Sequence, residues 1–370
     1  MHSDNDKYYE IRPYKDDEIQ GALERLINDD EFISAILKYR FPKLVAVGGW
    51  LLKPLLKSLL KKKWSNVRSV RDAQMQVATY MEQAIKHSSD GVTYSGIEKL
   101  DPNKAYLFVS NHRDIAMDPA LVNWGLHLHN RDTVRIAIGD NLLKKPCATE
   151  LMRLNKSFIV KRSAKGPREM MKALGLLSSY IKDSLEEGQS IWIAQKEGRA
   201  KDGNDVTDPA ILKMFHVNGR AQKIPFGEYM ASLNIVPVTI SYENDPCDLA
   251  KASELFQTRS SGAYEKAEFE DIESIVRGIV GQKRRIHVAF GDVVTEQFDN
   301  ADSLAKEIDR QIHANYHLFP VNYIAADKTH ESVTQAEQIR FTEKLSQISQ
   351  EEADIVRHMY AQPVEKAVTL

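Results

Sequence analysis

The sequence predicts an α/β fold: a mixed, largely parallel sheet flanked by helices, with an all-helical domain before it and a helical tail after it. Up to about residue 90, apolar residues recur only at helical spacing, without strand-like alternation. Beyond that point, short β-branched runs alternate with helical patterns, which is typical of an α/β domain. We therefore expect a helical domain over 1–90, an α/β domain over 91–324 and a helical tail over 325–370.

The individual elements follow from local patterns. In the first domain we expect helices over 16–28, 30–39, 44–63 and 67–86. In the α/β domain we expect strands over 92–96, 105–110, 134–139, 158–161, 190–195, 235–241 and 286–290. Further helices are expected over 301–316 and 331–359, with a linker near 325–330.

Prolines and glycines refine these expectations. The clearest helix begins at Pro167, because the first helical N–H has no partner inside the helix and its loss costs nothing; Gly188 ends that helix. Pro237 lies inside an expected strand. Because proline cannot donate to a strand ladder, we expect an edge or a bulge there.

The composition limits the classes of function. With 42% hydrophobic and 28% charged residues among 370, the chain is an ordinary globular protein with ample apolar side chains for a core. Its formal net charge of -2 argues against nucleic acid as a partner. Cys147 and Cys247 lie far apart, in no Cys/His cluster. We therefore expect no metal site and no disulfide framework, as in a reducing cytosol.

The sequence also bears on localisation. Its first ten residues are polar and acidic, so we expect no signal peptide. No run of eighteen apolar residues occurs, so no ordinary transmembrane helix is predicted. We expect a cytoplasmic protein that is soluble or peripheral on the cytoplasmic face of the membrane.

Residues 41–71 form a basic amphipathic segment. Leucines and lysines alternate between Trp50 and Trp64, Arg68 and Arg71 follow, and no acidic residue occurs. Such a segment suits a membrane interface, where each cation near anionic lipid contributes about 1 kcal/mol. A core-packing helix with a solvated basic face is the alternative. Pro54 is expected to break the segment into two pieces.

A polar cluster follows the expected strand 105–110. Asn111 and His112 come directly after it, where open α/β sheets place their ligand sites. Asp118 and Pro119 have the pattern of an N-cap and a first-turn proline, opening a helix that continues through Leu126.

A histidine followed closely by an aspartate is a base with a partner. The carboxylate holds the imidazole tautomer and stabilises the imidazolium after proton uptake. Both Asp114 and Asp118 are candidates for that partner, and Asp118 could instead be only a helix cap. A protein-kinase loop is excluded, because Pro119 occupies the position of the metal-binding asparagine. No Gly-x-Ser-x-Gly motif occurs, so we expect His112 to activate a substrate hydroxyl directly.

With three downstream blocks added, the chain resembles the glycerol-3-phosphate and lysophosphatidate acyltransferase superfamily, as a divergent branch, over about residues 90 to 295. The first block is Ser110-Asn111-His112 with Asp118-Pro119. The second is similar to the strand ending in a phosphate-binding arginine, Lys156 to Arg162. The others are Glu197-Gly198-Arg199-Ala200-Lys201, which resembles the family's Glu-Gly-x-Arg-Ser block, and the apolar run Ile235 to Ile240.

This resemblance implies roles for individual residues. It assigns general-base catalysis to His112, assisted by an aspartate, Asp118 or Asp114, and by Glu197. It implies phosphate binding by Arg162, Arg199 and Lys201, with Asn111 and Gly198 in support. The ends of parallel strands share one edge of a sheet, so we expect these cations to converge with His112. A turn-forming role is the alternative for Glu197, and we expect the charges of Lys161, Lys165 and Arg168 to be solvated.

Two spacings depart from the family pattern. Five residues separate His112 from Asp118 where the family has four, and one residue is lost between Gly198 and Arg199. Both changes fall in expected loops, which tolerate insertions and deletions.

The implied reaction is O-acylation in phospholipid biosynthesis. The acyl donor is acyl-CoA or acyl-carrier protein as co-substrate, with no other cofactor and no metal. The acceptor is glycerol-3-phosphate or lysophosphatidate. Two alternatives stay open: a lyso-lipid acceptor that lacks the phosphate, and a non-catalytic lipid- or anion-binding module, which the altered spacing of His112 and Asp118 motivates.

Overall fold

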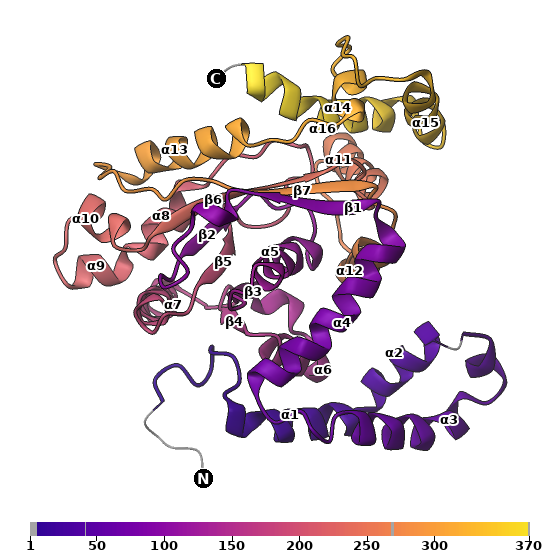
Figure 1. Ribbon diagram of the computed structural model, residues 1–370, viewed down its shortest axis with the longest axis vertical. Helices are drawn as coiled ribbons and strands as arrows, with labels where there is room; N and C mark the ends of the chain where they lie inside the picture. The colour runs from indigo at the N-terminus through magenta and orange to yellow at the C-terminus, as the bar shows by residue number, and fades with distance from the viewer. Residues whose placement is uncertain (1–5, 41, 268–269, 369–370) are drawn as a thin grey trace. The chain divides into compact units, whose positions relative to one another are not determined.

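The computed structural model describes residues 6–40, 42–267 and 270–368 (Figure 1). Its packing divides the chain into two compact units. We call the first the small unit, Met1–Tyr80 with Arg135–Leu177, and the second the large unit, Met81–Val134 with Ser178–Leu370. Both are discontinuous, because the chain leaves the large unit after Val134 and re-enters it at Ser178. The division at residues 90 and 324 stays a prediction.

The small unit contains the N-terminal helices that the apolar spacing predicted. These are α1 (Asp16–Asn28), α2 (Asp30–Arg40), α3 (Pro42–Lys63) and the first part of α4 (Val70–Ser88). The rest comprises a parallel strand pair and its neighbouring helices: β3 (Arg135–Gly139), η2 (Asp140–Leu142), α6 (Pro146–Leu154), β4 (Ser157–Val160) and the start of α7 (Pro167–Glu186). The predicted start of α7 at Pro167 is confirmed.

Helix α1 shows why these residues form helices. Asp16, Asp17 and Glu18 place negative charge in its first turn, beside the positive end of the helix dipole. The Glu18 carboxylate also accepts a hydrogen bond from the backbone N–H of Lys15 at 2.7 Å. The buried face of α1 packs in one apolar cluster with Val67 and Leu154.

The predicted break at Pro54 is wrong, because α3 continues through it. Proline removes one backbone hydrogen bond, and a helix can absorb that loss by bending. The predicted basic segment lies partly outside the described residues, since residue 41 and the side chains of 42–50, including Trp50, are not described. Among the helices described, none is both long and apolar enough to cross a membrane.

The large unit is built on a mixed, largely parallel sheet, as the sequence predicted. Its strands follow the order β1-β7-β6-β2-β5, and only the β6–β7 pair is antiparallel. All seven predicted strands of the chain are confirmed to within a few residues. Those of the large unit are β1 (Gly91–Ser95), β2 (Leu107–Ser110), β5 (Ile191–Ala194), β6 (Ile235–Tyr242) and β7 (Arg285–Phe290).

Helices cover this sheet and connect its strands. Helix α13, for example, packs on β6, where the Thr239 hydroxyl donates to the Ile312 carbonyl at 2.9 Å (Figure 1). The helical elements of the large unit, besides the later parts of α4 and α7, are η1 (Ile97–Lys99), α5 (Met117–Leu128), α8 (Pro209–Phe215), α9 (Val217–Ala221), α10 (Phe226–Ala231), α11 (Asp248–Ser261), α12 (Glu270–Val280), α13 (Ala301–Ala314), α14 (Pro320–Ala325), α15 (Gln335–Leu345) and α16 (Gln350–Val368).

Strand β6 contains Pro237 in the middle of the sheet, so the expected edge position is wrong. The Pro237 carbonyl accepts a hydrogen bond from Gly291 N at 2.8 Å, which places it on the β7 side. The β6–β7 ladder spans only Val238 to Tyr242 on β6. Since the nitrogen of a strand residue points to the same side as its carbonyl, the proline nitrogen lies just beyond that ladder, where no N–H is needed.

The C-terminal helices form part of a core. The predicted helical stretch 331–359 is two helices, α15 and α16, and the residues before the predicted linker form α14. Apolar residues of α15 and α16, among them Phe341, Val356 and Tyr360, are buried in one cluster with Ala252 of α11. These helices carry many charged residues, but their apolar residues share one face, and that face is buried in the core.

Candidate active site

Strand β2 ends at the first residues of the candidate site. All four of its residues are buried, and the strand lies between β5 and β6. Asn111 follows it and is fully buried. Its side chain accepts from Ile240 N at 2.8 Å and donates to Ile240 O and to Asp205 Oδ2, both at 3.1 Å. The amide thereby fixes the chain to β6 immediately before His112.

His112 and Asp118 form a hydrogen-bonded pair. His112 Nδ1 lies 2.8 Å from Asp118 Oδ2. A carboxylate can only accept, so Nδ1 carries the proton and Nε2 keeps its lone pair. Within the described part of the chain, Nε2 has no hydrogen-bond partner. The Trp192 indole of β5 packs edge to face on the imidazole, with ring centroids 5.6 Å apart. This arrangement has the geometry of a base oriented by a carboxylate.

Asp118 is not the N-cap of the helix, contrary to one reading of the sequence. Helix α5 begins at Met117, and Asp118 is its second residue, with a side chain 0% exposed. Its Oδ2 also accepts from Arg113 N at 2.6 Å and Asp114 N at 2.9 Å, and its Oδ1 accepts from the Tyr242 hydroxyl at 2.7 Å. A buried carboxylate needs such a set of donors, and the positive end of the helix dipole favours it further.

Asp114 lies beside this pair but does not contact His112. Its Oδ1 accepts from the backbone N–H groups of Ala116 and Met117, at 3.0 and 2.8 Å, which satisfies the start of α5. The backbone of Gly278 in α12 approaches so closely that a Cβ there would lie 2.0 Å from Asp114 Oδ2. Burial, and secondarily the charge of Asp118, raise the pKa of Asp114 to about 6.

The loop after β5 carries the third sequence block beside His112. Ala200 N donates to the His112 carbonyl at 2.8 Å, which joins this loop to the histidine backbone. Glu197 and Gly198 are exposed, and Arg199 is half-buried. The Lys201 ammonium forms an ion pair with Glu254. Any phosphate that bound Lys201 would therefore have to compete with this carboxylate.

Arg162 belongs to the small unit. It follows β4 and is exposed, and its backbone N–H donates to Asp140 Oδ1 at 3.2 Å. Burial opposes ionisation of Asp140, but hydrogen bonds from Ser163 and the charge of Arg162 outweigh it and lower the pKa of that carboxyl. Lys161 pairs with Glu10. The convergence of Arg162 with His112 stays a prediction.

Several residues of the site were not predicted from the sequence. Arg113 donates to Asp205 Oδ2 at 2.6 Å and to the Gly203 carbonyl at 3.3 Å, and Tyr316 donates to the same carboxylate oxygen at 2.7 Å. Trp192 and Tyr242 likewise reach the site from β5 and β6, strands that neighbour β2 in the sheet but lie far from it in sequence. No short sequence pattern marks any of them.

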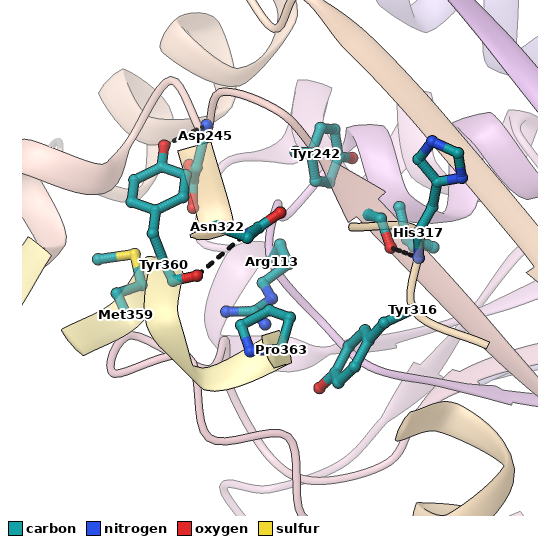
Figure 2. Close-up of a pocket in the computed structure, with 11 residues that line it drawn as sticks. Arg113, Tyr242, Asp245, Tyr316, His317, Asn322, Met359, Tyr360 and Pro363 are labelled. Carbon is teal, nitrogen blue, oxygen red and sulfur yellow. Dashed lines mark hydrogen bonds between the residues drawn. The ribbon is translucent and has the colours of Figure 1, made fainter. Parts of the chain in front are cut away.

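A cavity of about 40 Å³ adjoins these residues, large enough for a few water molecules (Figure 2). Arg113 and Tyr242 line it from the side of the candidate site, and Tyr360 and Pro363 of α16 line it from the C-terminal side. Across the described residues, no group of three His, Cys, Asp or Glu side chains is arranged to hold a metal ion.

Comparison with known proteins identifies the domain type. Residues 91–241 match the family model described as Acyltransferase. No curated protein matches the chain. Among solved structures, the 1-acyl-sn-glycerophosphate acyltransferase PlsC from Thermotoga maritima is similar, with a TM-score of 0.41 and 14% sequence identity; the match covers 80% of this chain and 94% of that chain.

The raised pKa of Asp114 predicts a pH-dependent stability. An unfolded aspartate titrates near pH 3.9, so between about pH 4 and pH 6 the folded state binds the proton more tightly, and stability falls as pH rises. Asp114→Asn keeps an oxygen acceptor for the two N–H groups and removes the charge. Urea unfolding should show this variant to be more stable than wild type at pH 7.5, by up to roughly 3 kcal/mol, and equally stable near pH 4. A difference independent of pH would contradict this account.

Proposed function

We propose a substrate class and a mechanism for this chain, which is an enzyme of the acyltransferase family with its family domain at residues 91–241. It transfers a fatty acyl group from acyl-CoA or acyl-carrier protein to a hydroxyl of a glycerol phosphate acceptor, lysophosphatidate or glycerol-3-phosphate, in phospholipid biosynthesis. The observation that carries the proposal is the His112–Asp118 pair at the end of β2, with Nε2 unbonded within the described chain.

The mechanism needs one base and no covalent enzyme intermediate. His112 Nε2 takes the proton of the acceptor hydroxyl as its oxygen attacks the thioester carbonyl. Asp118 stabilises the imidazolium through Nδ1. The tetrahedral intermediate then collapses, the C–S bond breaks, and the departing thiolate takes the proton from Nε2. The ester and the free thiol leave, and His112 is again neutral.

Arginines would bind the acceptor phosphate. A guanidinium donates two parallel hydrogen bonds to a phosphate, which suits Arg199 and Arg162. Arg199 follows β5, whose end lies beside that of β2 in the parallel register Ser110 to Ala194. Lys201 is the weaker candidate because it already pairs with Glu254. Glu197, exposed in the same loop, would orient the acceptor.

We also propose that α3 docks the enzyme on an anionic membrane surface, peripherally and on the cytoplasmic face. Leu51, Leu55 and Leu59 recur every fourth residue and are 62%, 59% and 55% exposed. The last turn of α3 adds three lysines, Lys61, Lys62 and Lys63. An exposed apolar stripe next to cations is the pattern of an interfacial helix.

Replacing the base tests the mechanism. His112→Ala should reduce acceptor-dependent release of thiol from a long-chain acyl-CoA by roughly 10² to 10⁴, because the hydroxyl loses its proton acceptor. His330→Ala, at an exposed histidine, is the control and should match wild type. Wild-type rates in His112→Ala would refute the mechanism. Release without acceptor would indicate a thioesterase, and activity only with acyl-carrier protein would identify the donor.

The arginines are tested through the acceptor. Arg199→Ala and Arg162→Ala should each raise the KM for the phosphate-bearing acceptor by roughly tenfold or more, because a charge-assisted hydrogen bond contributes about 1.5–3 kcal/mol. The KM for the acyl donor should change little. Arg220→Ala, at an exposed arginine of α9, serves as the matched control. Unchanged acceptor KM in both variants would point to an acceptor without phosphate.

Membrane docking is tested with vesicles. Leu55→Asp should weaken sedimentation with vesicles of phosphatidylglycerol and phosphatidylcholine by tenfold or more, because it places a charge in the apolar stripe. Ile339→Asp, at an isoleucine of α15 that is 49% exposed, controls for the loss of an exposed apolar side chain. Equal binding of both variants would rule out α3 as the docking element.

A further inference from the structure

The two oxygens of the Asp118 carboxylate differ in their hydrogen bonds. Oδ2 accepts from His112 Nδ1 and from two backbone N–H groups. Oδ1 accepts from the Tyr242 hydroxyl at 2.7 Å, and no other donor to Oδ1 is found among the residues that the structure describes. Because the carboxylate is fully buried, the phenol is what satisfies this oxygen.

Tyr242 is rigidly placed for this contact. It is the last residue of β6, paired in register with Ile286 of β7, and only 8% of it is exposed. Burial, and secondarily the charge of Asp118, raise the pKa of Tyr242 far above its ordinary value. The phenol therefore stays protonated across the range in which an enzyme works, and its hydroxyl acts as a donor to Asp118 throughout.

We propose that Tyr242 is a positioning residue that acts on His112 through Asp118, fixing the orientation of the pair and the pH range in which His112 serves as base. This inference rests on the proposed role of His112. It does not make Tyr242 a catalytic residue, because its hydroxyl is hydrogen-bonded to the buried carboxylate rather than presented to substrate.

Two physical effects follow from this hydrogen bond. First, the donor at Oδ1 fixes the rotation of the carboxylate, so that Oδ2 faces His112 Nδ1. Second, it draws negative charge towards Oδ1 and weakens the attraction between Oδ2 and the imidazolium. Without the phenol, the carboxylate would stabilise the imidazolium more. The acid limb of the pH–rate profile would then move to higher pH.

Other charged groups also lie around the pair, and Arg199 and Glu197 are in the loop joined to His112 by Ala200 N. Arg113 bonds Asp205, Lys251 bonds Asp245, and the buried Lys283 donates to Ser88 and to backbone carbonyls. Burial raises the pKa of Asp114 to about 6, within the pH range of the experiment. The Asp114→Asn background removes this second titration from the pH–rate profile.

The experiment is a pH–rate profile from pH 5 to pH 9 for the full chain, by thiol release with saturating acceptor. In Tyr242→Phe, the acid limb should move to higher pH by about half to one unit and kcat should fall about tenfold, since the lost bond involves a charged group. KM for donor and acceptor should stay within about twofold. The shift should persist when Asp114→Asn is added.

Tyr360→Phe provides the matched control. Tyr360 is also a buried tyrosine that lines the same cavity, and Figure 2 shows its hydroxyl beside Asp245, whose backbone N–H donates to it at 2.8 Å. This hydroxyl donates to Asp248 Oδ2 at 2.6 Å and so has no bond to Asp118. This variant should leave the acid limb in place. A Tyr242→Phe profile that matches wild type would overturn the inference, as would a loss of kcat with an unmoved acid limb. Full activity in His112→Ala would instead refute the proposed function on which the inference rests.

A second substitution avoids any failure to fold. Site-specific replacement of Tyr242 by 3-fluorotyrosine is nearly isosteric and makes the phenol a stronger donor. The acid limb should then move to lower pH, opposite to the effect of Tyr242→Phe. An unmoved limb, or one that moves to higher pH, would overturn the inference.

Discussion

The candidate active site depends on one buried negative charge. The Asp118 carboxylate is removed from water, and four donors compensate for that loss: an imidazole, two backbone N–H groups and a phenol. Leaving a buried carboxylate underbonded costs several kcal/mol. The backbone of residues 112–114 therefore turns around this side chain, and the turn orients the His112 imidazole with Nδ1 towards the carboxylate.

Secondary contacts hold this turn against the sheet. Asn111 joins it to β6, and Arg113 joins it to Asp205 in the loop after β5. The charges of Arg113 and Asp205 neutralise each other in the interior, where an unpaired charge would be strongly destabilising. Arg113 thus links the turn to the loop after β5, and its positive charge is paired with the Asp205 carboxylate.

Local patterns allowed most of the fold to be predicted. The strands could be predicted from β-branched runs and the N-terminal helices from the spacing of apolar residues. Each of these patterns is contained in a short stretch of sequence. His112 and Asp118 could be singled out because they are close in sequence. Tyr242, 124 residues from Asp118, could not, since a hydrogen bond over that separation leaves no trace in either local pattern. The reading of Asp118 as a cap failed because α5 already begins at Met117, where Asp114 Oδ1 accepts from the backbone N–H groups of Ala116 and Met117.

The last helix has a consequence for how the enzyme is made. Met359 O of α16 abuts Gly203 so closely that a Cβ there would lie 2.4 Å away, and Lys366 donates to Asn204 Oδ1 at 2.5 Å. The loop that carries Arg199 is thus supported by residues that leave the ribosome more than a hundred positions later. Strands β2 and β5 are both synthesised well before α16, so they can pair before that helix exists. The contacts of Met359 and Lys366 with this loop form only after α16 has been synthesised. A chain that ends before α16 therefore lacks these contacts to the loop that carries Arg199.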